Sequence, residues 1–131
     1  MLKVHSPLTE ETEARIEQII GCGIRVHREL GPGFLESVYR NAFCVELEHS
    51  EVPFEREKPV VIRYRGLQVA THRIDLVIWQ SVVVELKALK NVEEIHTAQL
   101  LSYLRATGLK VGLIMNFNGT TLKAGLRRVI L

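Results

Sequence analysis

Residues 74–87 read Ile74-Asp75-Leu76-Val77-Ile78-Trp79-Gln80-Ser81-Val82-Val83-Val84-Glu85-Leu86-Lys87, two apolar runs separated by Gln80-Ser81. Both runs are rich in β-branched residues, which predicts an antiparallel hairpin that turns near residue 80. The predicted register places Asp75, the one aspartate of the 131-residue chain, opposite Glu85. Facing side chains have Cβ atoms roughly 5 Å apart, where two like charges destabilise the sheet unless another group neutralises them.

A divalent cation is the simplest group that would neutralise this acidic pair. Glu85 and Lys87 are two residues apart and therefore project from the same face of the strand, beside Asp75. Two carboxylates that bind Mg²⁺ or Mn²⁺, with an ammonium nearby, are suited to phosphodiester hydrolysis. The metal activates a water molecule, and the ammonium offsets the negative charge that develops on the phosphate. The alternative is a cross-strand ion pair without metal, in which Asp75 or Glu85 pairs with Lys87 or Arg73.

The length and composition exclude several classes of protein. A chain of 131 residues fits one domain, residues 1–131, without disulfide staples. Cys22 and Cys44 lack metal-ligand spacing and are predicted to be buried free thiols. The first residues lack a signal-peptide pattern and no apolar run is long enough to cross a membrane, so we expect a soluble cytoplasmic protein. Walker, GxSxG and HExxH motifs do not occur.

The charge is unevenly distributed along the chain. The formal net charge is +2, but residues 87–131 carry seven Lys or Arg and two Glu. This basic end follows the carboxylate hairpin, so it either meets a polyanion such as nucleic acid or forms an ordinary solvated surface.

The periodicity of apolar residues predicts an α/β domain with a mixed sheet between helices, in the order α-α-β-β-β-α-β. The first helix is capped by Thr9 and stops at Gly31-Pro32-Gly33. A second helix is expected from Phe34 to His49, and a third begins after Asn91 and stops at Gly108. The expected strands are Val60 to Tyr64, Leu67 to Trp79, Val82 to Leu86 and Lys110 to Met115. No element is assigned to the tail from Thr120.

The two later helices carry further polar candidates. Glu36 and Tyr39 share one face of the second helix, where Glu36 is a third carboxylate for the site or the partner of Arg40 four residues on. Tyr39 is a substrate-binding candidate or a core tyrosine. Gln99 and Tyr103 form a polar stripe on the third helix, where they either contact the substrate or lie on a surface without a role.

These motifs together resemble a known family. Asp75 followed by Glu85-Leu86-Lys87 resembles the PD-(D/E)xK phosphodiesterase motif, and the order of elements resembles the restriction-endonuclease-like core. With Gly33-Phe34-Leu35-Glu36-Ser37-Val38-Tyr39 and the helix that carries Gln99 and Tyr103, the chain from about Leu8 to Leu131 resembles the small bacterial and archaeal GxxExxY proteins of that superfamily. Ile74 stands where the name of the motif has proline.

The resemblance implies a role for each matched residue. Asp75 and Glu85 would be metal ligands, Glu36 the acid of the first helices that often completes such sites, and Lys87 the catalytic lysine. Gln99 and Tyr103 match the QxxxY helix of RecB-like nucleases, where these residues face the substrate. The implied activity is Mg²⁺- or Mn²⁺-dependent hydrolysis of DNA or RNA.

Two other functions fit the same residues. One is a module that binds nucleic acid or protein on the nuclease fold without turnover. The other is a structural interaction protein in which Asp75, Glu85 and Lys87 satisfy one another without metal. Because the chain has no room for a separate specificity domain, a homodimer or a partner subunit is a further expectation.

Overall fold

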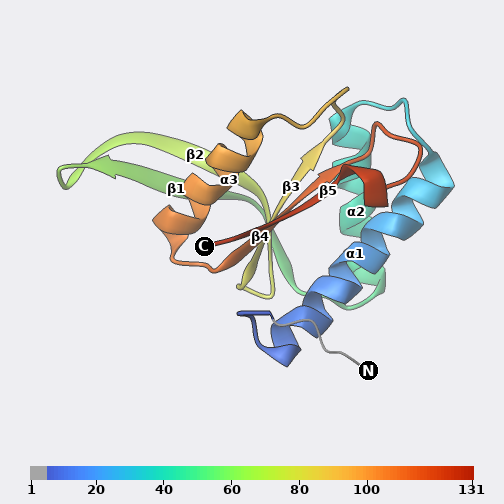
Figure 1. The fold of residues 1–131 in the computed structure, drawn as a ribbon, viewed down its shortest axis with the longest axis horizontal. Coiled ribbons are helices and arrows are strands. Elements are labelled where there is room, and N and C mark those ends of the chain that lie inside the picture. The colour runs from blue at the N-terminus through green and yellow to red at the C-terminus, as the bar shows by residue number, and fades with distance from the viewer. Residues whose placement is uncertain (1–5) are drawn as a thin grey trace.

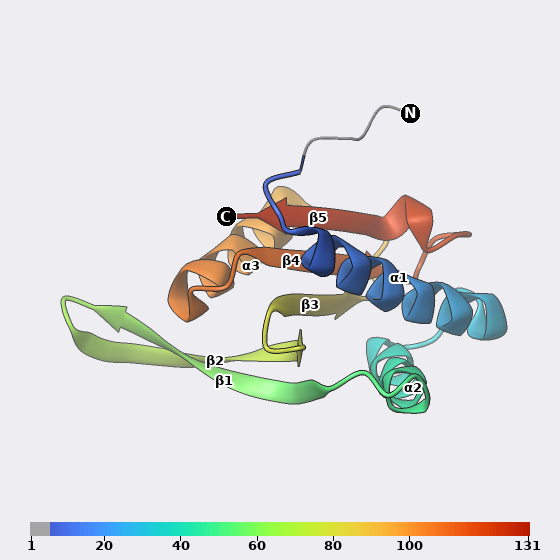
Figure 2. The ribbon, with the colours of Figure 1, turned by 90° about the horizontal axis from the view of Figure 1, so that it is seen from below.

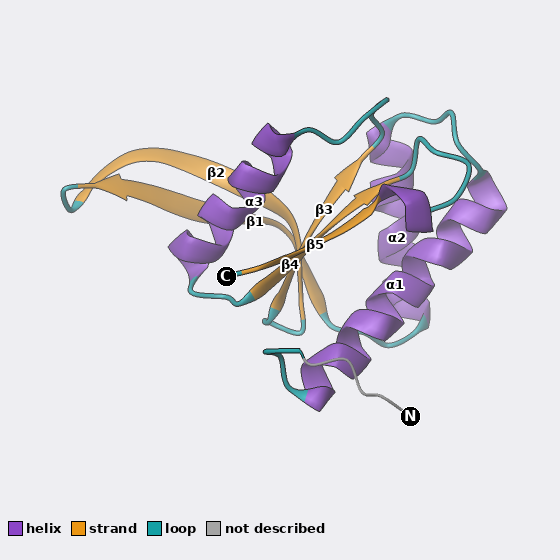
Figure 3. Ribbon diagram, in the orientation of Figure 1, coloured by secondary structure: helices purple, strands orange, loops and turns teal. Residues whose placement is uncertain are grey.

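The structure, a computed structural model, describes residues 6–131, and it is built around a twisted five-stranded sheet. The strands lie in the order β1 (Phe54–Tyr64), β2 (Leu67–Ile78), β3 (Val82–Lys87), β4 (Val111–Asn116) and β5 (Leu126–Ile130). All neighbours are antiparallel except β3 and β4, which are parallel. Figures 1 and 3 show the sheet between its helices. The predicted mixed α/β sheet is therefore confirmed.

The helices lie in two layers. α1 (Glu10–Leu30) and α2 (Glu36–His49) cover one face of the sheet, and α3 (Glu94–Thr107) covers the other (Figure 2). α3 connects the parallel strands β3 and β4, which need such a crossover. The main core lies under α1 and α2, and a smaller core lies under α3.

The first helix begins and ends as the sequence predicts. Thr9 is its N-cap and accepts a hydrogen bond from the Thr12 amide at 3.1 Å, and three glutamates follow in the first turn. The chain then reverses through Gly31 and Gly33, whose φ angles of 68° and 114° are accessible to glycine at little cost. This turn sets α2 beside α1.

The predicted β2–β3 hairpin is present. Its register pairs Leu76 with Val84 and Ile78 with Val82. The turn places Trp79 and Gln80 at φ angles of 53° and 54°, and the Ser81 amide donates to the Ile78 carbonyl at 3.1 Å. Two successive positive φ angles are typical of the tight turns that match the twist of paired strands.

Two strands differ from the prediction. β1 begins at Phe54 instead of Val60, and β5 forms in the tail that had no assignment. β5 pairs antiparallel with β4 at the edge of the sheet, after a short 3-10 turn at Lys123–Gly125. Its two arginines and its shortness weaken the sequence signal for a strand, although charged residues are common on edge strands.

The remaining expectations concern the cysteines and the membrane. Cys22 and Cys44 are both buried and unpaired, as predicted. Within residues 6–131, no helix combines the length and the apolar character that crossing a membrane requires.

Candidate active site

The acidic pair lies at a fork where β2 separates from β3. The ladder between these strands ends at Leu76 and Val84, one pair before Asp75 and Glu85. Asp75 also has no backbone partner on β1, where Glu57 has a φ angle of 48°. Irregular backbone of this kind commonly occurs beside active sites, where it redirects a side chain.

The alternation of side chains along β2 changes at Asp75. Ile74 and Val77 both belong to the core under α3, whereas Leu76 and Ile78 belong to the core under α1 and α2. A regular strand would place Ile74 and Leu76 on the same face. Asp75 therefore lies at the point where the strand exchanges its two faces, and its carboxylate lies beside Arg40 of α2. Ile74, which stands at the proline position of the motif, is fully buried.

The two carboxylates take over hydrogen bonds that a continuing ladder would make. The Leu86 amide donates to Asp75 Oδ2 at 2.9 Å, and the Asp75 amide donates to Glu85 Oε1 at 3.4 Å. Each carboxylate is thereby fixed to the opposite strand. The predicted proximity of Asp75 and Glu85 follows from these bonds, although the two residues are not themselves a ladder pair.

Glu85 is 7% exposed, and its environment disfavours a negative charge. Burial raises the pKa of Glu85, the charge of Asp75 raises it further, and the result is a pKa of about 8. The charge of Lys87 acts in the opposite direction. At neutral pH the pair therefore holds a proton between its carboxyl groups unless a cation replaces it.

The positive charge nearest to Asp75 in a salt bridge is the guanidinium of Arg40. Its Nη2 donates to Glu36 Oε1 at 2.6 Å, and its Nε lies 3.4 Å from Asp75 Oδ1. The Nε group is buried and lacks the geometry of a hydrogen bond to any described residue. The pairing of Glu36 with Arg40, which was the alternative to a metal-binding role, is thus present, and the same arginine connects Glu36 to the acidic pair. The sequence alone did not place Arg40 at this site.

Lys87 ends β3 beside the pair, with its side chain partly exposed. Between residues 6 and 131, neither Lys87 nor Arg73 forms a salt bridge. The cross-strand ion pairs that these two residues offered as an alternative are therefore not formed. The Lys87 ammonium lies close enough to Glu85 to influence its pKa and remains available to another group.

The side of the site facing α3 contains Tyr103 and His72. Burial raises the pKa of the Tyr103 hydroxyl, and the nearby charges of Glu85 and Asp75 raise it further. The hydroxyl lies 3.3 Å from His72 Nδ1 on β2. Gln99, one turn earlier on α3, is exposed. Sequence reasoning missed His72, whose position follows only from the pairing of β2 with β1 and the packing of α3.

Tyr39 is fully buried, and its hydroxyl has two backbone partners. It donates to the Gly31 carbonyl at 2.6 Å and accepts from the Phe34 amide at 3.1 Å. Its ring stacks on Phe117 with the centroids 4.7 Å apart. In this arrangement Tyr39 fastens the glycine turn to the core and has no group free for a substrate, which corresponds to the core-tyrosine alternative.

A divalent cation fits the chemistry of the acidic pair. Asp75 and Glu85 offer hard oxygen ligands that repel each other when both are ionised, and a bound cation removes that repulsion. Across residues 6–131, no three Asp, Glu, His or Cys side chains are arranged as a metal site. Glu36 would join the pair only by leaving Arg40.

A mixed sheet flanked by helices, with an acidic pair and a lysine where two central strands separate, defines a domain of the restriction-endonuclease type. The chain belongs to the PD-(D/E)XK nuclease superfamily, whose family model matches residues 13–129. The match runs from the first turns of α1 into β5 and so includes every candidate residue. Neither the curated proteins nor the solved structures contain a match to the chain.

Proposed function

We propose that this protein is a metal-dependent nuclease that hydrolyses phosphodiester bonds of DNA or RNA, and that it is a single-domain GxxExxY member of its superfamily. The observation that carries the proposal is the pair of buried Glu85 and half-buried Asp75 beside Lys87, which has no salt-bridge partner among residues 6–131. A protein gains nothing in stability from burying Glu85 where desolvation and the charge of Asp75 both raise its pKa, so such a pair is a candidate for function.

Asp75 and Glu85 are the proposed ligands of Mg²⁺ or Mn²⁺, and Glu36 is the proposed third carboxylate. When bound, the ion supplies Lewis-acid polarisation of a phosphoryl oxygen and a water of lowered pKa. Without the ion, Arg40 lies against Glu36 and Asp75, so both carboxylates have a compensating positive charge and a defined position. A bound cation would take the place of the Arg40 guanidinium at these two carboxylates.

Lys87 is the proposed catalytic lysine. Its ammonium has no salt-bridge partner among residues 6–131 and lies beside Glu85, where it would hold the attacking water and stabilise negative charge on the phosphate. Tyr103 and Gln99 are the proposed substrate contacts on α3, and the contact of Tyr103 with His72 adds that histidine to the same face.

A module that binds nucleic acid without turnover is the second candidate. The salt bridge between Arg40 and Asp75 favours it, because an arginine that already compensates the carboxylate reduces the need for a metal ion. The two candidates differ in hydrolysis and agree in binding.

A cleavage assay with matched variants tests the proposal. Purified protein is incubated with single- and double-stranded DNA and RNA in Mg²⁺, Mn²⁺ or EDTA, beside Asp75→Asn and Glu17→Gln. Both variants replace an acid by an amide, but Glu17 is an exposed residue of α1. We expect cleavage that needs a divalent ion, is lost in Asp75→Asn and is unchanged in Glu17→Gln. Binding without cleavage by the unmodified protein would support the second candidate, and cleavage by Asp75→Asn would reject the site.

A further inference from the structure

The β1–β2 hairpin extends well beyond the rest of the sheet. We call residues 58–73 the arm, which is the part of the hairpin beyond Glu57 on β1 and Ile74 on β2. β3 pairs with β2 only at residues 76–78, so the arm has no third strand beside it. Figures 1 and 2 show it projecting from the sheet as a two-stranded ribbon. Every residue from Arg63 to Val69 is exposed.

The outer part of the arm has large apolar side chains that no element within residues 6–131 covers. Tyr64, Leu67 and Val69 are 67%, 72% and 59% exposed. A two-stranded hairpin alone is at best marginally stable in water, and exposed apolar side chains on it add no stability. A projecting ribbon of this kind is therefore expected to gain contacts from a bound molecule.

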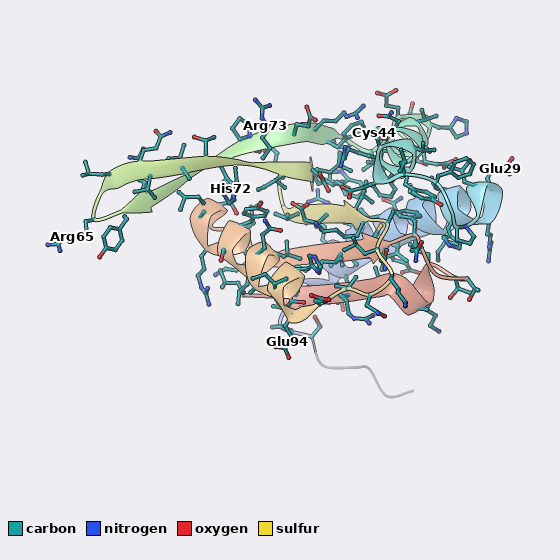
Figure 4. The ribbon with its side chains drawn as sticks, turned by 90° about the horizontal axis from the view of Figure 1, so that it is seen from above. Glu29, Cys44, Arg65, His72, Arg73 and Glu94 are labelled. Atoms are coloured by element: carbon teal, nitrogen blue, oxygen red, sulfur yellow. The ribbon has the colours of Figure 1, made fainter. Side chains whose placement is uncertain are left out.

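The charge of the arm indicates which molecule that is. The arm contains Lys58, Arg63, Arg65 and Arg73 and no acidic residue. Lys58 pairs with Glu55, but the three arginines form no salt bridge with any residue from 6 to 131. Figure 4 shows Arg65 at the tip, and Arg73 and His72 pointing to opposite sides of the ribbon. Uncompensated arginines on a narrow ribbon are suited to phosphate groups.

The arm also begins at the candidate active site. Arg73 is two residues from Asp75 on β2, and His72 contacts Tyr103 of α3. A nucleic acid with a phosphodiester at Asp75 therefore passes the root of the arm.

We propose that the arm is a nucleic-acid-binding element, in which Arg63, Arg65 and Arg73 bind backbone phosphates and Tyr64 stacks on an unpaired base. The inference rests on the proposed function and adds to it where the substrate is held. Arginines next to an exposed aromatic ring are the combination that binds single strands, because phosphate contacts follow the backbone and every base has a face for stacking. The proposed substrate class is thus nucleic acid with a single-stranded portion.

Binding in EDTA tests the arm without requiring cleavage. Fluorescence anisotropy measures the affinity of labelled single-stranded DNA and RNA for the unmodified protein, Arg63→Ala/Arg65→Ala and the control Arg25→Ala/Arg28→Ala. Both double variants remove two exposed cations, but the control residues lie outside the arm. Arg28 is next to Glu29, which lies at the opposite end of the molecule from Arg65 (Figure 4).

We expect the arm variant to bind at least about tenfold more weakly at low salt. The slope of the logarithm of its binding constant against the logarithm of the salt concentration should decrease in magnitude by about one to two. The control should keep both values. Tyr64→Ala should weaken single-strand binding at least about fivefold, and Tyr64→Phe should restore most of it because the ring still stacks. Unchanged melting temperatures would show that these exposed positions leave the fold intact.

Other outcomes would overturn the inference, and they are separate from failure of the proposed function. If the unmodified protein does not bind nucleic acid, or the two double variants bind equally, the arm is not a binding element even where cleavage is seen. Binding that depends on the arm but is not followed by cleavage would reject the nuclease and keep the arm. A dimer that dissociates to monomer in the arm variant, with affinity unchanged, would identify the arm as a self-association surface instead.

Discussion

Arg40 Nη2 lies 2.6 Å from Glu36 Oε1 while Arg40 Nε lies 3.4 Å from Asp75 Oδ1, so one guanidinium joins two of the three proposed metal ligands, one on α2 and one on β2. A divalent cation at Asp75 would act on the same carboxylate as this arginine. Arginine and metal are therefore alternative neutralising charges, and the stability of the metal-free protein depends on the arginine.

Removing Arg40 should destabilise the protein mainly when no metal is present. Arg40→Ala leaves a partly buried Asp75 without its cation, which costs about 1–3 kcal/mol in the free energy of unfolding. Saturating Mn²⁺ should restore part of this loss because it neutralises the same carboxylate. Urea unfolding with Mn²⁺ or EDTA measures both values, with Arg28→Ala as the control. If Arg40→Ala lowers the free energy of unfolding equally in Mn²⁺ and in EDTA, Arg40 and the metal do not neutralise the same carboxylate.

Divalent ions should stabilise the unmodified protein. A ligand that binds only the native state at about 100 times its Kd adds about 2.7 kcal/mol to the free energy of unfolding. The melting temperature should therefore rise with millimolar Mn²⁺ or Mg²⁺, and Asp75→Asn should abolish the rise while leaving the metal-free protein folded. A melting temperature that is indifferent to both ions would favour a site compensated by Arg40 alone.

The Glu85 carboxyl should make the metal-free protein less stable as the pH rises. Its pKa is about 8 in the folded state against 4.5 as its ordinary value, so between these values the native protein holds a proton that the unfolded chain has lost. Stability then falls through this window, by on the order of a few kcal/mol. Glu85→Gln, which carries no titratable proton, should lack this fall.

Urea unfolding in EDTA between pH 5 and pH 9 measures the effect as the difference between the unmodified protein and Glu85→Gln, because other groups titrate equally in both. Glu17→Gln should follow the unmodified protein. Parallel curves for all three proteins would show that Glu85 is ionised at neutral pH and that the pair is less strongly coupled than its burial indicates.

Lys87→Ala should separate catalysis from binding. The ammonium is not a metal ligand, so the variant should retain the melting-temperature shift with Mn²⁺ and the affinity for nucleic acid. It should lose most of kcat, by about a hundredfold or more, because charge on the phosphate is no longer offset in the transition state. Lys90→Ala removes an exposed lysine three residues further on and should cleave normally. Equal cleavage by both variants would assign hydrolysis to other residues.

The two tyrosines should respond differently to loss of the hydroxyl. Tyr39→Phe leaves the Gly31 carbonyl and the Phe34 amide without their partner and should cost about 1–3 kcal/mol in stability. Tyr103→Phe loses one long contact to His72 and should cost less than about 1 kcal/mol, but should weaken substrate binding. Thermal unfolding and anisotropy measure the two effects. A Tyr103→Phe variant with unchanged affinity would leave Tyr103 a core residue.

Local signals in the sequence were sufficient for most of the fold. The β2–β3 hairpin and the caps of α1 depend on residues close together in the chain, and the predicted register and Thr9 cap are both present. β5 was missed because its strand character comes from pairing with β4, and not from its own alternation of apolar and polar residues. Tertiary context often decides edge strands in this way.

Residues that meet across layers were harder to predict. Arg40 comes within reach of Asp75 because the glycine turn sets α2 against the fork, and no spacing in the sequence encodes that distance. His72 likewise meets Tyr103 only through the packing of α3. The proximity of Asp75 and Glu85 was predictable because both belong to one hairpin.

The irregular pairing at Asp75 divides β2 into two parts with different expected dynamics. Residues 76–78 are buried between two neighbouring strands, so their amides should exchange with solvent only when the whole domain unfolds. Residues 67–69 are exposed and have one neighbouring strand, so they should open locally at little cost. A ligand that orders the arm reduces the conformational entropy of the strand that carries Asp75. If the arm binds nucleic acid as proposed, we expect its occupancy to increase order at the acidic pair, because both lie on β2.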